Sequence, residues 1–166
     1  MKKLFTIGYE GAKLDDFVEA LRAAKIDVLL DIREIPVSRR RGFSKTVLGQ
    51  TVEASGIAYR HERQLGSPKV IRHRLREDGN YDRFFRDFGR YLDKQWELLE
   101  ALAAELKGNV ALMCYEKDHT DCHRRSVAEA LAELLGKTPI HLGVEDHARE
   151  ASEAARSHPR QGLSAA

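Results

Sequence analysis

Two cysteines, Cys114 and Cys122, lie close together in the chain, and the sequence contains no others. Cys122 is followed directly by His123, and Glu116 comes two residues after Cys114. A thiol can act as a nucleophile or redox group, while an imidazole or carboxylate beside it transfers protons. These residue types at this spacing predict a catalytic site made of Cys114, Glu116, Cys122 and His123.

The two cysteines differ in their sequence surroundings. Cys114 closes an apolar run that begins at Val110, which is typical of a small buried core residue. Cys122 stands just before a predicted helix, where the positive end of the helix dipole and Arg124 favour a thiolate over the ordinary pKa of about 8.5. Cys122 is therefore the better candidate for a nucleophile, with His123 or Glu116 as its acid or base.

A metal site is the alternative use of these residues. Cys114, His119, Cys122 and His123 all carry side chains that ligate transition metals. Their spacing matches no paired zinc-ligand pattern, so we expect neither a metal nor another cofactor.

The elements that must position the site alternate along the chain. Five apolar runs have the length of strands, at residues 4–8, 28–32, 57–61, 110–114 and 140–142. Apolar residues at helical spacing fill the intervals, and the longest such segment spans residues 82–107. This order predicts a single-domain α/β fold, with a mostly parallel sheet of about five strands and helices on both faces.

Length and composition agree with one domain. The 166 residues suffice for one core, which we place at residues 1–145, and the Ala-, Glu- and Arg-rich residues 146–166 predict a C-terminal helix or tail. No apolar run approaches the roughly 20 residues that cross a bilayer, and charged residues follow the first strand too soon for a signal peptide. We expect a cytoplasmic protein with reduced thiols and no membrane contact, in an oligomeric state that the sequence leaves open.

Polar residues follow the predicted strands at their carboxyl ends. Parallel strands end at one edge of a sheet, where ligands bind in open α/β folds, so we expect these side chains to share a cleft. Besides the catalytic set they are Tyr9, Asp31, Arg33 and His61. Asp31 and Arg33 flank Ile32, and the pattern is equally compatible with one of them facing inward as a buried structural ion that pairs across the sheet. His61 alone is more typical of an ordinary hydrogen-bonded residue.

The charge is unevenly distributed along the chain. The net charge is +2, but residues 33–76 hold eleven Lys and Arg against three Asp and Glu, so this segment carries +8 and the remainder −6. A basic face of this kind favours phosphate-bearing partners, either nucleic acid or a small molecule such as a nucleotide. Arg33, Arg39 and Arg124 are the predicted anion-binding residues. The alternative is a solvated surface whose arginines pair with acids elsewhere.

Several short motifs give the chain a family resemblance. They lie at residues 6–9, 31–33, 42–45, 56–59, 112–116 and 122–124. In them the chain resembles the bacterial and archaeal family known as domain of unknown function 488. Many relatives carry Gly-His-Ser-Asn in the first motif, where this chain has Gly-Tyr-Glu-Gly. The resemblance implies an α/β fold and a set of site residues, and it implies no established reaction.

Three functions are compatible with these patterns. The leading hypothesis is an enzyme that acts on a phosphate-bearing substrate at the Cys, His, Arg and Glu site. A non-catalytic nucleic-acid-binding module, with cysteines that merely pack, is the first alternative. The second is a sulfur carrier centred on Cys114, because the order of Asp31, Arg33 and Cys114 resembles rhodanese-like sulfurtransferases.

Overall fold

The five predicted strands form one parallel sheet in the computed structural model, which describes residues 1–157. They are β1 (Lys3–Gly8), β2 (Val28–Asp31), β3 (Ala58–His61), β4 (Asn109–Cys114) and β5 (Ile140–Leu142). The strand order is β3-β2-β4-β1-β5, and all four neighbouring pairs are parallel. The predicted α/β class and parallel sheet are confirmed.

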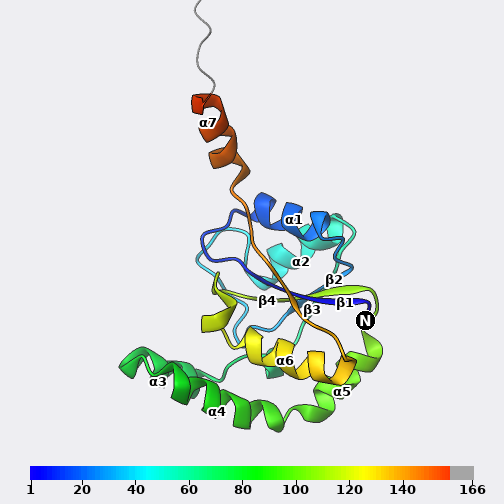
Figure 1. Ribbon diagram of the computed structural model, residues 1–166, viewed down its shortest axis with the longest axis vertical. Coiled ribbons are helices and arrows are strands. Elements are labelled where there is room, and N and C mark those ends of the chain that lie inside the picture. Colours follow the sequence, from blue (N-terminus) through cyan, green and yellow to red (C-terminus); the bar gives the residue numbers. More distant parts are fainter. Residues whose placement is uncertain (158–166) are drawn as a thin grey trace, which may run out of the picture.

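Helices cover both faces of this sheet, as Figure 1 shows. On one face lie α1 (Leu14–Ala23) and α2 (Lys45–Ala54), and on the other lie α4 (Tyr81–Asp93), α5 (Trp96–Glu105) and α6 (Arg124–Leu135). Alternate strand residues enter the two resulting cores: Ala111 and Met113 pack with α1 and α2, whereas Val110 and Leu112 pack with α4, α5 and α6. Burial on both faces explains why the central strands β1, β2 and β4 are mostly apolar.

The predicted long helix at residues 82–107 is wrong, because the segment forms two helices. Between α4 and α5, the N–H groups of Lys94 and Gln95 bond to the carbonyls of Tyr91 and Leu92, three residues back, and close a turn. Both helices still pack on the same face of the sheet. The apolar pattern therefore continues through the turn and hides it from a sequence reading.

A further helix, α3 (Lys69–Asp78), has no counterpart in the predicted elements. None of its residues is buried, so it lacks the apolar stripe by which helices are recognised in a sequence. It packs against α4, partly through ion pairs of Arg83 with Asp78 and of Arg74 with Asp87. Two short 3-10 helices, Arg63–Leu65 and His119–Asp121, complete the loops near the carboxyl edge.

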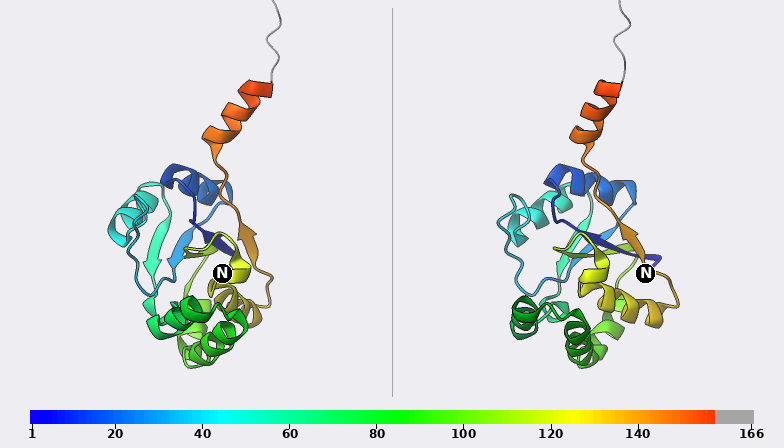
Figure 2. Two further views of the ribbon diagram at one scale, coloured as in Figure 1. Left: turned by 90° about the vertical axis from the view of Figure 1, so that its left-hand side faces the viewer. Right: turned by 60° about the vertical axis from the view of Figure 1, so that its left-hand side comes forward.

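The last described helix, α7 (His147–Ser157), projects away from the sheet and its covering helices in every view (Figures 1 and 2). The rest of the predicted C-terminal tail, residues 158–166, lies outside the described residues. Within residues 1–157, no helix combines the length and the apolar character needed to span a membrane.

Candidate functional site

The carboxyl ends of β1, β2 and β4 meet at the centre of one sheet edge. The register places Gly8 beside Cys114, and Asp31 between Met113 and His61. The residues that follow these strands are therefore close in space, although they are far apart in the sequence.

Asp31 and Arg33 are both buried and form an ion pair with each other, whereas the sequence had suggested only that one of them faces inward. Arg33 donates from Nε and Nη2 to the two carboxylate oxygens of Asp31, at 2.8 and 2.6 Å. Its Nη1 donates to the carbonyl of Phe43 and contacts the Tyr9 hydroxyl, at 2.7 and 3.1 Å. The Tyr59 hydroxyl donates to Asp31 as well, at 2.6 Å. Most of the donors of Arg33 are thus engaged within the protein.

The ionisation of these groups follows from their contacts. Burial alone would lower the pKa of Arg33, but the hydrogen bonds and charge of Asp31 outweigh it and raise the pKa above its ordinary value. Burial, together with the negative charge of Asp31, raises the pKa of Tyr59. Arg33 therefore remains charged and Tyr59 remains neutral at physiological pH.

Cys114, Glu116 and His123 form a cluster beside this pair. The Cys114 sulfur lies 3.7 Å from Nδ1 of His123 and 3.3 Å from Oε2 of Glu116, to which its S–H donates. Nε2 of His123 lies 3.2 Å from the Ile32 carbonyl, which can only accept a hydrogen bond. In neutral His123 the proton is therefore on Nε2, and the Nδ1 lone pair faces the thiols.

The charges within the cluster are coupled. Burial alone would raise the pKa of Glu116, but a hydrogen bond from Cys122, the Glu116 backbone and the charge of His123 lower it, so Glu116 is a carboxylate. Burial would lower the pKa of His123, and the neighbouring Cys122 and Glu116 raise it instead. The Phe88 ring packs edge-on against His123 at 5.2 Å between ring centres, which holds the imidazole in place.

Burial opposes the expected activation of Cys122. Its side chain is 1% exposed, and burial, with Cys114 next to it, raises the pKa of the Cys122 thiol well above its ordinary value. Desolvation thus outweighs the helix dipole on which the prediction relied. Its sulfur lies 4.0 Å from Nδ1 of His123 and accepts a hydrogen bond from the backbone N–H of Arg124, at 3.4 Å.

Arg124 binds the backbone of the loop after β4 and does not line the cleft that opens at this edge of the sheet. It is 1% exposed, and its guanidinium donates to the carbonyl oxygens of Glu116 and Lys117. Gly8 makes room for this arrangement, because a Cβ there would collide with the Glu116 carbonyl. The predicted anion-binding residue is thus buried against the protein's own backbone.

His61 also lies apart from the cysteines. Its Nε2 lies 2.8 Å from the carbonyl oxygen of Arg33, so it supports the backbone behind the ion pair. Tyr9 is 3% exposed and stacks on Phe43, with 4.4 Å between ring centres.

A cleft of about 550 Å³ opens over the cluster at this edge. Cys114, Glu116 and His123 line its floor, and Tyr9, Arg33 and the exposed Arg39 of the predicted substrate-binding set line it too. Further lining residues, outside the predicted set, include Ser67, Arg72, Arg76 and Tyr115. In the sequence, only the basic composition of residues 33–76 pointed to Arg72 and Arg76, because the helix α3 that carries them was not predicted.

Two features of the cleft wall favour a bound anion. The Ser67 hydroxyl is buried and has no hydrogen-bond partner among the described residues. Arg39 and Arg76 have no ion-pair partner within residues 1–157, whereas Arg72 pairs with Glu34 at 2.6 Å. Other arginines of the basic segment pair on the surface, such as Arg60 with Glu62 and Glu105. The basic segment therefore supplies both a cleft wall and an ordinary solvated surface.

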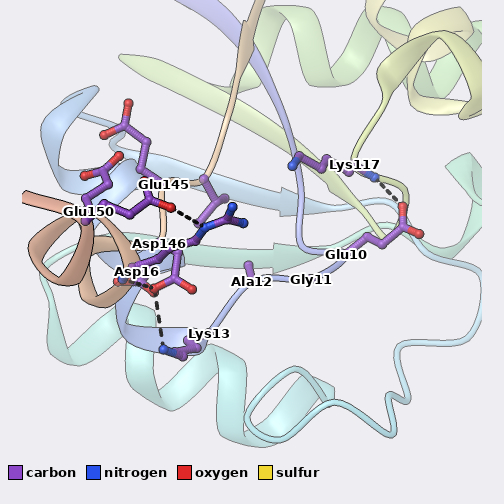
Figure 3. Close-up of a pocket in the computed structure, with 12 residues that line it drawn as sticks. Glu10, Gly11, Ala12, Lys13, Asp16, Lys117, Glu145, Asp146 and Glu150 are labelled. Carbon is purple, nitrogen blue, oxygen red and sulfur yellow. Dashed lines mark hydrogen bonds and ion pairs between the residues drawn. The ribbon is translucent and has the colours of Figure 1, made fainter. Parts of the chain in front are cut away.

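A second hollow, of about 630 Å³, lies between α7 and the turn after β1 (Figure 3). Its walls are mostly charged residues, and contacts such as Lys13 with Asp146, at 3.5 Å, link the residue before α7 to the body (Figure 3). Neither a thiol nor a buried polar group of the described residues lines it. The chemistry-bearing groups are in the cleft at the sheet edge, so we place the candidate site there.

The comparison with known families supports the resemblance seen in the motifs. The family model described as domain of unknown function DUF488 matches residues 13–131, which is most of the chain. The protein belongs to this family. The matched region includes β2, β4, both cysteines and the basic segment. No curated protein matches the chain, and no solved structure does.

Proposed function

We propose that the protein is an enzyme that acts on a phosphate-bearing substrate, a nucleotide or a single-stranded nucleic acid. One observation carries this proposal: the cleft that contains Cys114, Glu116 and His123 is also lined by arginines without internal partners. Arg39 and Arg76 would bind the phosphate, and the cluster on the floor would supply the chemistry. Because both thiols are free, we expect the protein to work in the reducing cytoplasm.

The cleft also has an apolar side that suits a nucleobase. Tyr115 is 46% exposed, Ile35 53% and Val37 71%, and all three line the cleft. Exposed aromatic side chains next to arginines form the stacking surface on which proteins bind unpaired bases, and Ile35 and Val37 would add apolar contact to the stacking on Tyr115. This favours a nucleotide over a phosphate ester without a base.

Binding is tested with two probes, adenosine monophosphate and a labelled single-stranded oligonucleotide, at several salt concentrations. The double variant Arg39→Gln/Arg76→Gln should weaken the binding of both probes. For the oligonucleotide, the slope of the logarithm of the binding constant against the logarithm of the salt concentration should become shallower by roughly 0.7 for each phosphate contact that is lost. Arg74→Gln is the matched control, since Arg74 lies on α3 but pairs with Asp87 and does not line the cleft.

The reaction is tested by assaying turnover of phosphate-ester substrates with the native protein and with Cys114→Ser. If the native protein turns over a substrate and Cys114→Ser does not, although the variant still binds both probes, the result would support an enzyme. Binding of both probes without turnover of any substrate would favour the non-catalytic nucleic-acid-binding module. Equal affinity of the arginine double variant and the native protein would overturn the proposed use of the cleft.

A further inference from the structure

We propose that Cys114, Cys122 and His123 together bind a divalent metal ion that prefers sulfur ligands, zinc above all. The inference deepens the proposed function, because it assigns a chemical role to the cluster on the floor of the same cleft. It also explains why a second thiol, Cys122, lies behind the cleft without lining it.

The spacing of the three donor atoms supports a shared ion. Nδ1 of His123 lies 3.7 Å from the Cys114 sulfur and 4.0 Å from the Cys122 sulfur, and all three atoms lie within 4.8 Å of one another. Tetrahedral zinc with Zn–S of about 2.3 Å and Zn–N of about 2.0 Å separates sulfur from nitrogen by roughly 3.6 Å and two sulfurs by roughly 3.8 Å. Small side-chain adjustments would therefore complete the site.

The surroundings of these atoms are those of metal ligands. A metal-bound histidine usually donates its other N–H to a carbonyl or carboxylate, which fixes the ring and directs the free lone pair at the metal. His123 has such a contact through Nε2 and the Ile32 carbonyl, at 3.2 Å. The backbone N–H of Arg124 donates to the Cys122 sulfur, a contact that stabilises a negatively charged ligand.

The fourth position faces the cleft. The Glu116 carboxylate lies 3.3 Å from the Cys114 sulfur and can occupy this position or hold a water there. Three protein ligands with an open fourth position are typical of catalytic zinc. Such an ion would polarise an oxygen of a phosphate-bearing substrate, and Cys114 would then be a ligand and not a nucleophile.

The donor set favours zinc over magnesium or calcium, which prefer oxygen ligands. A different group of possible ligands, Glu145, His147 and Glu150, lies exposed at the start of α7. It contains no sulfur, so the two sites differ in their spectra.

Cobalt(II) is the probe, because thiolate bound to cobalt absorbs in the near ultraviolet and tetrahedral cobalt absorbs in the visible range. The full chain is reduced, stripped of metal with a chelator and titrated with cobalt. We expect both absorptions to saturate at one equivalent and to disappear on addition of zinc. No near-ultraviolet band at one equivalent, or cobalt binding without that band, would overturn the proposal.

Three variants locate the site. Cys114→Ser and Cys122→Ser should each reduce the thiolate band and weaken cobalt binding by more than about 100-fold, the upper end of the effect of losing one outer-shell contact. His119→Gln is the control: this histidine is in the same loop but stacks on His141, with 3.5 Å between ring centres. A band of native intensity in both cysteine variants would overturn the assignment.

The native spectrum keeps the test decisive if a cysteine variant fails to fold, because that spectrum alone reports thiolate ligation. Nucleotide binding is measured separately, on the metal-free protein. If the native protein shows no thiolate band but its nucleotide binding depends on Arg39 and Arg76, only the metal site is overturned. If the native protein shows the thiolate band but its nucleotide binding does not depend on these arginines, the proposed function is overturned and the metal site is retained.

Discussion

His123 points Nδ1 at the Cys114 sulfur from 3.7 Å, across the gap between the start of α6 and the end of β4. The contact joins the two parts of the chain that carry both cysteines. Its geometry depends on the Ile32 carbonyl at the end of β2, which holds the far side of the ring. Three separate segments therefore fix the relative positions of these two atoms.

Asp31→Asn should destabilise the protein by about 3–5 kcal/mol, because it leaves the buried Arg33 guanidinium without its counter-charge. Glu129→Gln, which removes the exposed partner of Arg125, should change stability by less than about 1 kcal/mol. Urea denaturation of both variants measures the difference. If both variants lose only a similar small amount of stability, the ion pair of Asp31 with Arg33 does not stabilise the fold.

Gly8→Ala should destabilise the protein by about 1–3 kcal/mol, because the new methyl group meets the Glu116 carbonyl and must displace the loop that carries the cluster. Gly89→Ala, within α4, meets no atom within 4 Å and should stabilise by about 0.5–1 kcal/mol. Denaturation midpoints of the two variants should therefore shift in opposite directions. A shift in the same direction would contradict the close packing at β1.

Ser67→Ala should leave the free energy of unfolding unchanged or raise it slightly, since the buried hydroxyl makes no hydrogen bond among the described residues. The same variant should weaken adenosine monophosphate binding several-fold, by about 1 kcal/mol, if the hydroxyl donates to the phosphate. Calorimetric titration beside thermal unfolding separates the two effects. Unchanged affinity would remove Ser67 from the anion site.

Stability should fall on acidification through the titration of His141. Its Nδ1 lies 2.7 Å from the Thr6 hydroxyl, and burial, with the charges of His119 and Arg124, lowers the pKa of His141. The folded protein thus binds this proton more weakly than the unfolded chain, so stability is lost as the pH falls below about 6.5 and through the folded pKa.

The measurement is the free energy of unfolding at pH 7.5 and pH 5. His141→Gln should reduce the difference between the two values, whereas His73→Gln, on exposed α3, should leave it in place. A difference that is identical in the native protein and in His141→Gln would exclude this histidine as the cause.

The sequence predicted the sheet well, because strands buried on both faces must be apolar throughout. It also predicted the shared carboxyl edge, since parallel pairing brings strand ends together. Its errors concern tertiary surroundings. The dipole argument for Cys122 ignored the desolvation that burial in the loop imposes, and Arg124 looked free because its backbone partners at residues 116 and 117 are visible only in three dimensions. The catalytic roles themselves stay predictions.

The central place of β4 in the sheet has a consequence for how the chain folds. β1 and β2 do not pair with each other. β2 pairs with β3 as well as with β4, but β1 pairs with β4 and β5 among the described strands, and the chain reaches β4 only after residue 108. Closing so long a loop before the central strands pair makes folding slow, because the chain loses conformational entropy before the contacts that offset this loss have formed. During synthesis, β1 should stay unpaired until β4 leaves the ribosome, and nascent chains cut off before that point should be the ones that chaperones and proteases engage.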